Sequence, residues 1–125
     1  MNKWMAYLVL GSCLLSAQEA RPKSRWRTML YRVSVVALTA STAADVGTSW
    51  GGRESNPALR GADGRFGARG AALKFGLLGG ALVTEYWLHR KHPNSDTAVM
   101  IFNASMAAVS TRAAVHNAGV QRRAQ

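Results

Sequence analysis

The sequence contains a single cysteine, Cys13, among its 125 residues. One cysteine excludes an internal disulfide and a metal site built from several cysteines, so the redox compartment cannot be inferred from cysteine pairing. Acidic residues are also scarce, because six Asp and Glu stand against 16 Lys and Arg, for a formal net charge of +10. This excess of positive charge suits two kinds of anionic partner, nucleic acid and lipid headgroups.

The chain also lacks the usual marks of an enzyme. It has no nucleophile with an adjacent base and no glycine loop that would cradle a phosphate. His89 and His92 have a spacing that can bind a metal on a helix, but no third ligand lies nearby in the sequence. We therefore predict no catalytic residue, no metal and no cofactor, and we lean against an enzyme.

Apolar residues concentrate in four stretches, roughly 4–17, 33–50, 71–88 and 98–116, and basic residues lie mostly between them. Alternating apolar segments and cationic connectors are typical of a protein that crosses a membrane several times. We predict an all-α fold, a small transmembrane helical bundle of three main spans over residues 31–120, followed by a basic tail at 121–125. The expected location is the prokaryotic cytoplasmic membrane, with multiple passes.

The first 17 residues have the layout of a secretory signal peptide, with Lys3, an apolar run and small residues at the end. Two alternatives stay open, an uncleaved anchor and a lipoprotein box at Leu10-Gly11-Ser12-Cys13. Residues 18–30 form a polybasic juxtamembrane segment, in which Pro22 prevents helix continuity. Its cations are suited to the anionic headgroups of the bilayer.

The first main span, about 31–50, carries Asp45 inside an apolar stretch. Ser34, Ser41, Asp45 and Thr48 share one side at helical spacing. A charged side chain in hydrocarbon costs about 2.5–3.5 kcal/mol on insertion scales, so Asp45 needs a partner or a proton.

The polar connection after this span contains Glu54, Asn56 and Pro57. Asn as a cap and Pro at the first helical position predict a short interfacial helix near 57–61. The Asp-Gly pair that follows predicts a turn over 62–65. Catalysis by Glu54 with Asn56 is an alternative, but capping and loop structure account for both residues.

The second span, about 71–88, repeats small residues every four positions. Gly76 and Gly80 within this repeat form the small-x-x-x-small pattern by which membrane helices approach closely. Lys74 and Glu85 are eleven residues apart and lie on nearly the same side of the helix. They either join a polar interior or extend toward the two interfaces as anchors.

The third span, about 97–117, places Asn103, Ser110 and Asn117 seven residues apart, a polar line suited to hydrogen bonds across helices. Arg112 lies inside the apolar segment, where its fork can engage Asp45, or it reaches the interface if the helix ends earlier. The predicted intramembrane polar cluster comprises Asp45, Thr48, Lys74, Glu85, Asn103 and Arg112.

These features resemble a family of small, uncharacterised prokaryotic integral membrane proteins of unknown function. In that family the first span carries D-x-x-T, an E-x-N-P motif follows, and later spans hold a lysine and an asparagine. The matching residues are Asp45, Thr48, Glu54, Asn56, Pro57, Lys74, and Asn103 or Asn117. The resemblance covers about residues 30–120 and implies a membrane location but little about activity. The first and third spans are weaker in this chain.

Three functions are compatible with the sequence. The first is a noncatalytic membrane protein that packs through its helices with a second copy or with another membrane protein. The second is a small ion or proton transporter that uses Asp45 within the membrane. The third, which we favour least, is a soluble basic helical protein that binds nucleic acid.

Overall fold

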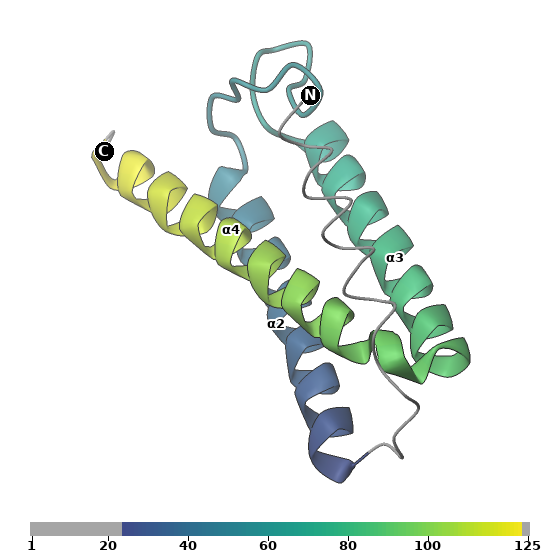
Figure 1. Cartoon of the computed structure of the whole chain (residues 1–125). Coiled ribbons are helices and arrows are strands. Elements are labelled where there is room, and N and C mark those ends of the chain that lie inside the picture. The colour runs from purple at the N-terminus through teal and green to yellow at the C-terminus, as the bar shows by residue number, and fades with distance from the viewer. Residues whose placement is uncertain (1–23, 124–125) are drawn as a thin grey trace, which may run out of the picture.

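The computed structural model describes residues 24–123, which form three long helices (Figure 1). Helix α2 comprises Arg25–Ser49, α3 comprises Ala68–Lys91 and α4 comprises Asp96–Arg123, with the short 3-10 helix η1, Pro93–Ser95, between α3 and α4. The prediction of an all-α fold with three main helices is confirmed. The predicted signal peptide over 1–17 and its two alternatives lie outside the described residues, as do positions 18–23 of the polybasic segment.

Each helix is longer than the span predicted for it. Helix α2 begins at Arg25 because the Ser24 hydroxyl accepts a hydrogen bond from the Arg27 N–H at 3.2 Å, which caps the first turn. Helix α3 continues to Lys91, and its basic last turn suits the negative end of the helix dipole. Helix α4 continues to Arg123, so positions 121–123 of the predicted basic tail are helical.

The connection between α2 and α3 folds back on itself at one end of the bundle (Figure 1). Gly51 and Gly64 have φ angles of 73° and 77°, a left-handed conformation that glycine adopts without steric cost. The N–H of Gly51 donates to the carbonyl of Phe66 at 2.9 Å, which closes the loop against the start of α3. The predicted turn over 62–65 is confirmed, because the Asp63 carboxylate accepts the Arg65 N–H at 3.1 Å.

The predicted short helix near 57–61 is wrong. The N–H groups of Leu59 and Arg60 both donate to the carbonyl of Asn56, each at 3.1 Å, so one turn forms. The N–H of Gly61 then donates to the carbonyl of Arg65 at 2.8 Å. The backbone pairing across the loop takes the donor that a second helical turn would need.

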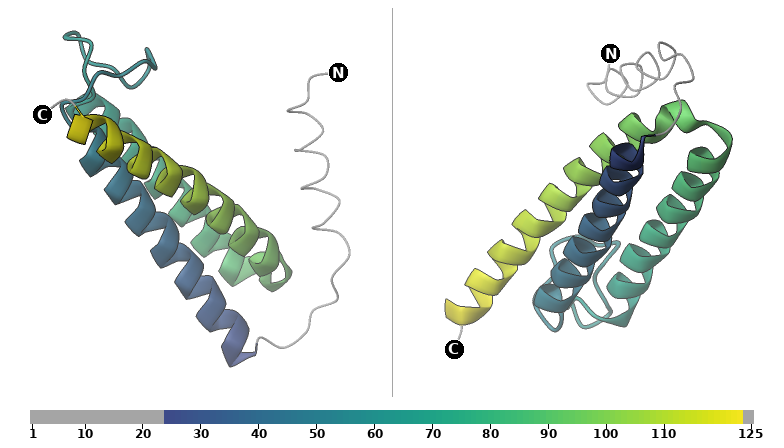
Figure 2. Two further views of the ribbon diagram at one scale, coloured as in Figure 1. Left: turned by 90° about the vertical axis from the view of Figure 1, so that its left-hand side faces the viewer. Right: turned by 90° about the horizontal axis from the view of Figure 1, so that it is seen from below.

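The three helices run up, down and up, with α2 between α3 and α4 in the right-hand view of Figure 2. Helix α2 packs mainly against α4, and α3 contacts both helices less closely. Hydrogen bonds between α2 and α4 advance together along both helices, from Arg27–Thr97 to Asn117–Ser49, so the two run parallel. Helices α3 and α4 meet at η1 and diverge from it (Figure 2).

The apolar core is small and lies near the loop. Val46, Phe66 and Ala71 form a buried cluster, with the partly buried Leu59 packed against it. Gly70 makes this packing possible, because a Cβ there would lie 2.5 Å from the Phe66 ring and 2.6 Å from the Leu59 carbonyl oxygen.

Polar side chains occupy much of the interior, and large apolar side chains cover the outside. The buried polar residues are Ser41, Thr42, Asp45, Ser49, Glu85, Ser95, Asp96 and Asn103. By contrast, Leu77, Val83 and Val115 are about 70% exposed, at 74%, 70% and 69%. This distribution is the reverse of the one expected when water surrounds a helical bundle.

Among the described helices, α4 is the one long and apolar enough to cross a membrane, judged by length and composition. Only 17% of its apolar window is buried inside the bundle. Helices α2 and α3 do not pass this test. One spanning helix is therefore supported, where three were predicted.

Candidate functional site

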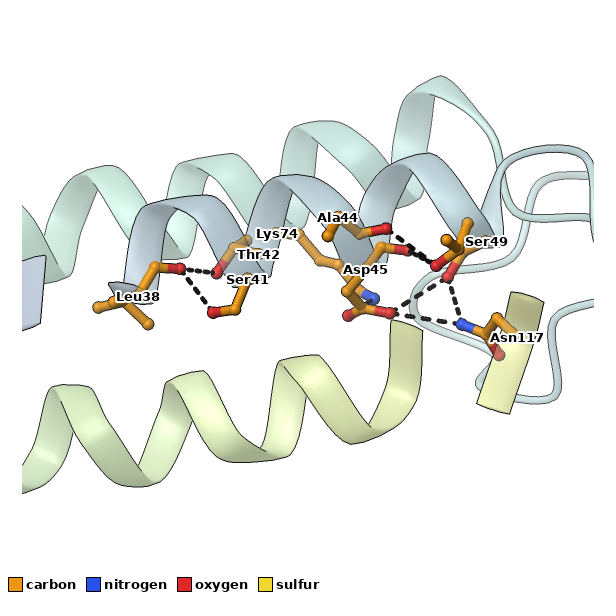
Figure 3. A network of polar contacts seen from close by, with 9 residues as sticks. Leu38, Ser41, Thr42, Ala44, Asp45, Ser49, Lys74 and Asn117 are labelled. Atoms are coloured by element: carbon orange, nitrogen blue, oxygen red, sulfur yellow. Dashed lines mark hydrogen bonds and ion pairs between the residues drawn. The ribbon is translucent and has the colours of Figure 1, made fainter. Parts of the chain in front are cut away.

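Asp45 lies on the inner face of α2, in the last third of the helix. The buried residues of α2, namely Leu38, Ser41, Thr42, Asp45, Val46 and Ser49, recur at intervals of three and four and so share one face. Asp45 itself is 6% exposed. Its carboxylate contacts α3, where the Lys74 ammonium donates to Oδ2 at 2.5 Å (Figure 3). The partner that the sequence required for Asp45 is therefore Lys74.

Two further donors complete the environment of this carboxylate. The Ser49 hydroxyl donates to Asp45 Oδ1 at 3.3 Å, and the Asn117 amide of α4 donates to the same oxygen at 3.4 Å (Figure 3). The Asn117 amide also donates to the Ser49 hydroxyl at 2.8 Å. We call Asp45, Ser49, Lys74 and Asn117 the Asp45 cluster. It joins all three helices through the Asp45 carboxylate.

Thr48 is next to this cluster without belonging to it. Its hydroxyl donates to the carbonyl of Ala44 at 2.9 Å, within α2 itself. The Thr48 carbonyl accepts a hydrogen bond from the Gln121 side chain at 2.8 Å, which adds a contact to α4. The threonine of the D-x-x-T pattern therefore contributes through its backbone.

The predicted pairing of Arg112 with Asp45 is wrong. Arg112 is exposed, on a different side of α4 from Asn117. Lys74 occupies the position that the guanidinium was expected to take. The error has a simple cause, because spacing along one helix does not determine which cation of another helix faces a given acid.

Glu85 and Asn103 form a second polar site nearer the η1 end. Glu85 is 4% exposed and Asn103 is fully buried. The Asn103 amide donates to Glu85 Oε2 at 3.0 Å and to the Ser34 hydroxyl at 3.2 Å, so α2, α3 and α4 meet again here. The predicted polar cluster is thus divided into two layers, one around Asp45 and one around Glu85.

The same end holds an aromatic contact and a contact between a histidine and a carboxylate. The Tyr31 ring stacks on His89 with centroids 4.3 Å apart, and His89 Nδ1 lies 2.9 Å from Asp96 Oδ1. Arg27 donates to the Thr97 hydroxyl at 2.9 Å. The start of α2 is therefore tied to the turn between α3 and α4.

The loop motif forms its own turn over a polar pocket. Glu54 Oε1 accepts the Asn56 N–H at 2.8 Å, and Asn56 Oδ1 accepts the Ala58 N–H at 3.0 Å. Pro57 lies at the start of that turn. Glu54, His116 and Asn117 line a pocket of about 300 Å³ that extends toward the Asp45 cluster. These contacts indicate that Glu54 and Asn56 stabilise the conformation of the loop.

The Asp45 cluster is built to hold charge. Its acid has an ammonium and two neutral donors, a set that stabilises the ionised carboxylate. Over residues 24–123, no group of three His, Cys, Asp or Glu side chains is arranged to hold a metal ion. The arrangement can join helices and keep two charges out of water.

Some contributors were not predicted as site residues. Ser49 lies four residues after Asp45, so helical spacing alone contained a signal for it. Gln121 was assigned to a basic tail, and its contact with Thr48 depends on α4 continuing that far. The sequence left open whether Asn103 or Asn117 matches the asparagine of the family it resembles. In the structure, the Asn117 amide donates to Asp45 and the Asn103 amide donates to Glu85.

No protein family, no curated protein and no solved structure matches this chain. The resemblance to the D-x-x-T and E-x-N-P family therefore stays a prediction.

Proposed function

We propose that the chain is a noncatalytic, multi-pass membrane protein that acts by helix packing, through association of α3 with a second copy or with another membrane protein. The observation that supports this proposal is the distribution of side chains, with large apolar ones on the outside of the bundle and polar ones inside it. Val36, Leu77 and Val109, one from the middle of each helix, are 65%, 74% and 63% exposed. Burial of such a side chain contributes about 1.5–3 kcal/mol, so apolar faces of this extent favour lipid or a protein partner over water.

The distribution of charge supports the same environment. Asp45 and Lys74 neutralise each other inside the bundle. The other Lys and Arg side chains, apart from the exposed Arg112 within α4, gather at the two ends of the helices. They lie in the first turns of α2 and the last turn of α3 at one end, and in the loop and the end of α4 at the other. Cations at both ends suit anionic headgroups on both sides of a bilayer.

Helix α3 offers the face for association. A Cβ added to Gly76 or Gly80 would meet no atom within 4 Å, so neither glycine is used for packing inside the bundle. Ala72 and Thr84, one turn before and one turn after, are also exposed. Small residues on an outer face let another helix approach closely, where van der Waals contact and weak hydrogen bonds stabilise association.

The experiment replaces both glycines in the full chain with leucine. We expect the Gly76→Leu/Gly80→Leu variant to fractionate with membranes as the wild type does, but to lose most of its cross-linked oligomer in mild detergent. The matched control is Gly47→Leu on α2, which is also open to its surroundings. Unchanged cross-linking of the double variant, or equal loss in the control, would reject association through this face.

The other two functions have less support. Lys74, Ser49 and Asn117 account for the position of Asp45 without a transport step. A nucleic-acid binder has use for the cations at the helix ends, but not for the apolar faces between them. Flux that disappears in Asp45→Asn proteoliposomes would favour the transporter instead.

A further inference from the structure

A groove of about 330 Å³ lies between α3 and α4, close to η1. Small and apolar residues line most of it, among them Ala81, Leu88, Ala98, Val99 and Phe102. Its volume is at the lower end of the range of about 300–1,000 Å³ that is usual for small-ligand pockets. A compact apolar group therefore fits it.

Glu85 lines this groove and is its acidic group. The carboxylate is 4% exposed, and its Oε2 accepts one hydrogen bond from Asn103. The other oxygen, Oε1, has no hydrogen-bond partner among the described residues, and neither has Asn103 Oδ1. No cation of residues 24–123 forms an ion pair with Glu85. Lys74, on the same helix, lies three turns away and pairs with Asp45 instead.

The remaining polar side chains of the groove cannot satisfy Glu85. The Thr84 hydroxyl donates to the carbonyl of Gly80 at 2.9 Å, and the Ser95 hydroxyl donates to the carbonyl of His92 at 2.7 Å. The wall of the groove thus holds one buried acceptor without a partner, Glu85 Oε1, and no uncommitted hydroxyl donor. A buried acceptor without a donor is costly, and a buried carboxylate without a cation more so.

We propose that this groove binds a lipophilic amine, a primary or secondary ammonium on a compact apolar body. An ammonium N–H donates to Glu85 Oε1 and the positive charge neutralises the carboxylate. The apolar body lies against Ala98, Val99 and Phe102. The groove shares Gly80 and Thr84 with the glycine face of α3. Its acid, Glu85, is buried, and the proposed binding does not depend on association through that face.

The test uses the purified full chain in detergent and two probes of one shape, cyclohexylmethylamine and cyclohexylmethanol. Ligand-observed NMR titration measures both dissociation constants. We expect the amine to bind the wild type at least about tenfold more tightly than the alcohol, since a charge-assisted bond contributes about 1.5–3 kcal/mol. Glu85→Gln should remove that difference, and Asp63→Asn, an exposed loop acid changed in the same way, should preserve it.

A second variant separates the apolar part of the site from the acid. Ala98→Leu fills the groove without changing charge, and we expect it to weaken amine binding at least about fivefold while the helical circular dichroism signal stays intact. Equal affinity of the wild type for amine and alcohol, no binding of either, or amine binding unaffected by Glu85→Gln and Ala98→Leu would each overturn the proposal. If Glu85→Gln does not fold, the comparison of probes on the wild type and Ala98→Leu still decides.

Discussion

At the scale of single residues, the Asp45–Lys74 ion pair places two opposite charges inside the bundle. The two side chains are not buried equally, because Lys74 is 19% exposed and Asp45 8% exposed at the side chain. Lys74 can extend toward the surface on its flexible stem, whereas Asp45 is held on the inner face of α2. Loss of Lys74 and loss of Asp45 should therefore destabilise the bundle by different amounts.

The first prediction concerns this inequality. Lys74→Met leaves Asp45 buried with Ser49 and Asn117 as its donors, and should destabilise the bundle by about 3 kcal/mol. Asp45→Asn should cost less, because the freed Lys74 can reach water. The double variant should recover part of the loss. Thermal unfolding followed by circular dichroism gives all three values, and equal losses in both single variants would contradict the burial argument.

The second prediction concerns Gly70. Gly70→Ala places a Cβ against the Phe66 ring and the Leu59 carbonyl, so it should destabilise the protein by about 1–3 kcal/mol. Gly79→Ala is the matched control, since nothing lies within 4 Å of its Cβ position. That change should be neutral or stabilise by up to about 1 kcal/mol. Chemical denaturation of both variants measures the contrast, and equal effects would show that Phe66 packs elsewhere.

At the scale of helices, α2 and α4 form the tighter pair, with Asn117 as a central link. Asn117→Ala removes donors to both Asp45 and Ser49, and we expect it to cost about 1–3 kcal/mol. His116→Ala, next to it on the exposed face of α4, should change stability little. The thermal midpoints of the two variants test whether Asn117 links α2 to α4. Equal shifts in both variants would contradict this role.

The helices themselves were largely predictable from the sequence, and their ends were not. The apolar stretches located α2, α3 and α4, but the predicted spans missed the first six residues of α2, which begins at Arg25, and the last six of α4, which ends at Arg123. The start of α2 depends on the Ser24 cap, and the failure of a helix near 57–61 depends on the bond from Gly61 to Arg65. The second of these is a long-range contact, which residue spacing does not contain.

The sequence predicted which residues belong to the candidate site better than it predicted which of them contact one another. Helical spacing brought Asp45 to an inner face and put Lys74 and Glu85 on one side of α3. It did not show that Lys74 would face Asp45 while Arg112 faced outward, because that depends on how the helices rotate against one another. Rotation is set by packing, including the fit of Phe66 over Gly70.

At the scale of the whole molecule, the distribution of side chains indicates what surrounds the bundle. Apolar side chains cover most of the middle of each helix and polar side chains fill much of the interior. Basic side chains gather at the ends, apart from the exposed Arg112 in α4. Of the described helices, α4 has the length and composition to cross a membrane by itself. For α2 and α3, burial of Asp45, Lys74 and Glu85 inside the bundle would lower the cost of entering lipid.

Cysteine labelling reports directly on whether lipid surrounds the bundle. In a Cys13→Ser background, single changes Val36→Cys, Leu77→Cys and Val109→Cys probe the exposed middle of each helix, while Asp63→Cys and Lys91→Cys probe the two ends. Sheared membranes opened on both sides are treated with a charged maleimide. If lipid surrounds the bundle, the two end positions react, and the three middle positions react only after the membrane is dissolved. Labelling of the middle positions as fast as the ends in intact membranes, or recovery of the chain in the soluble fraction, would contradict it.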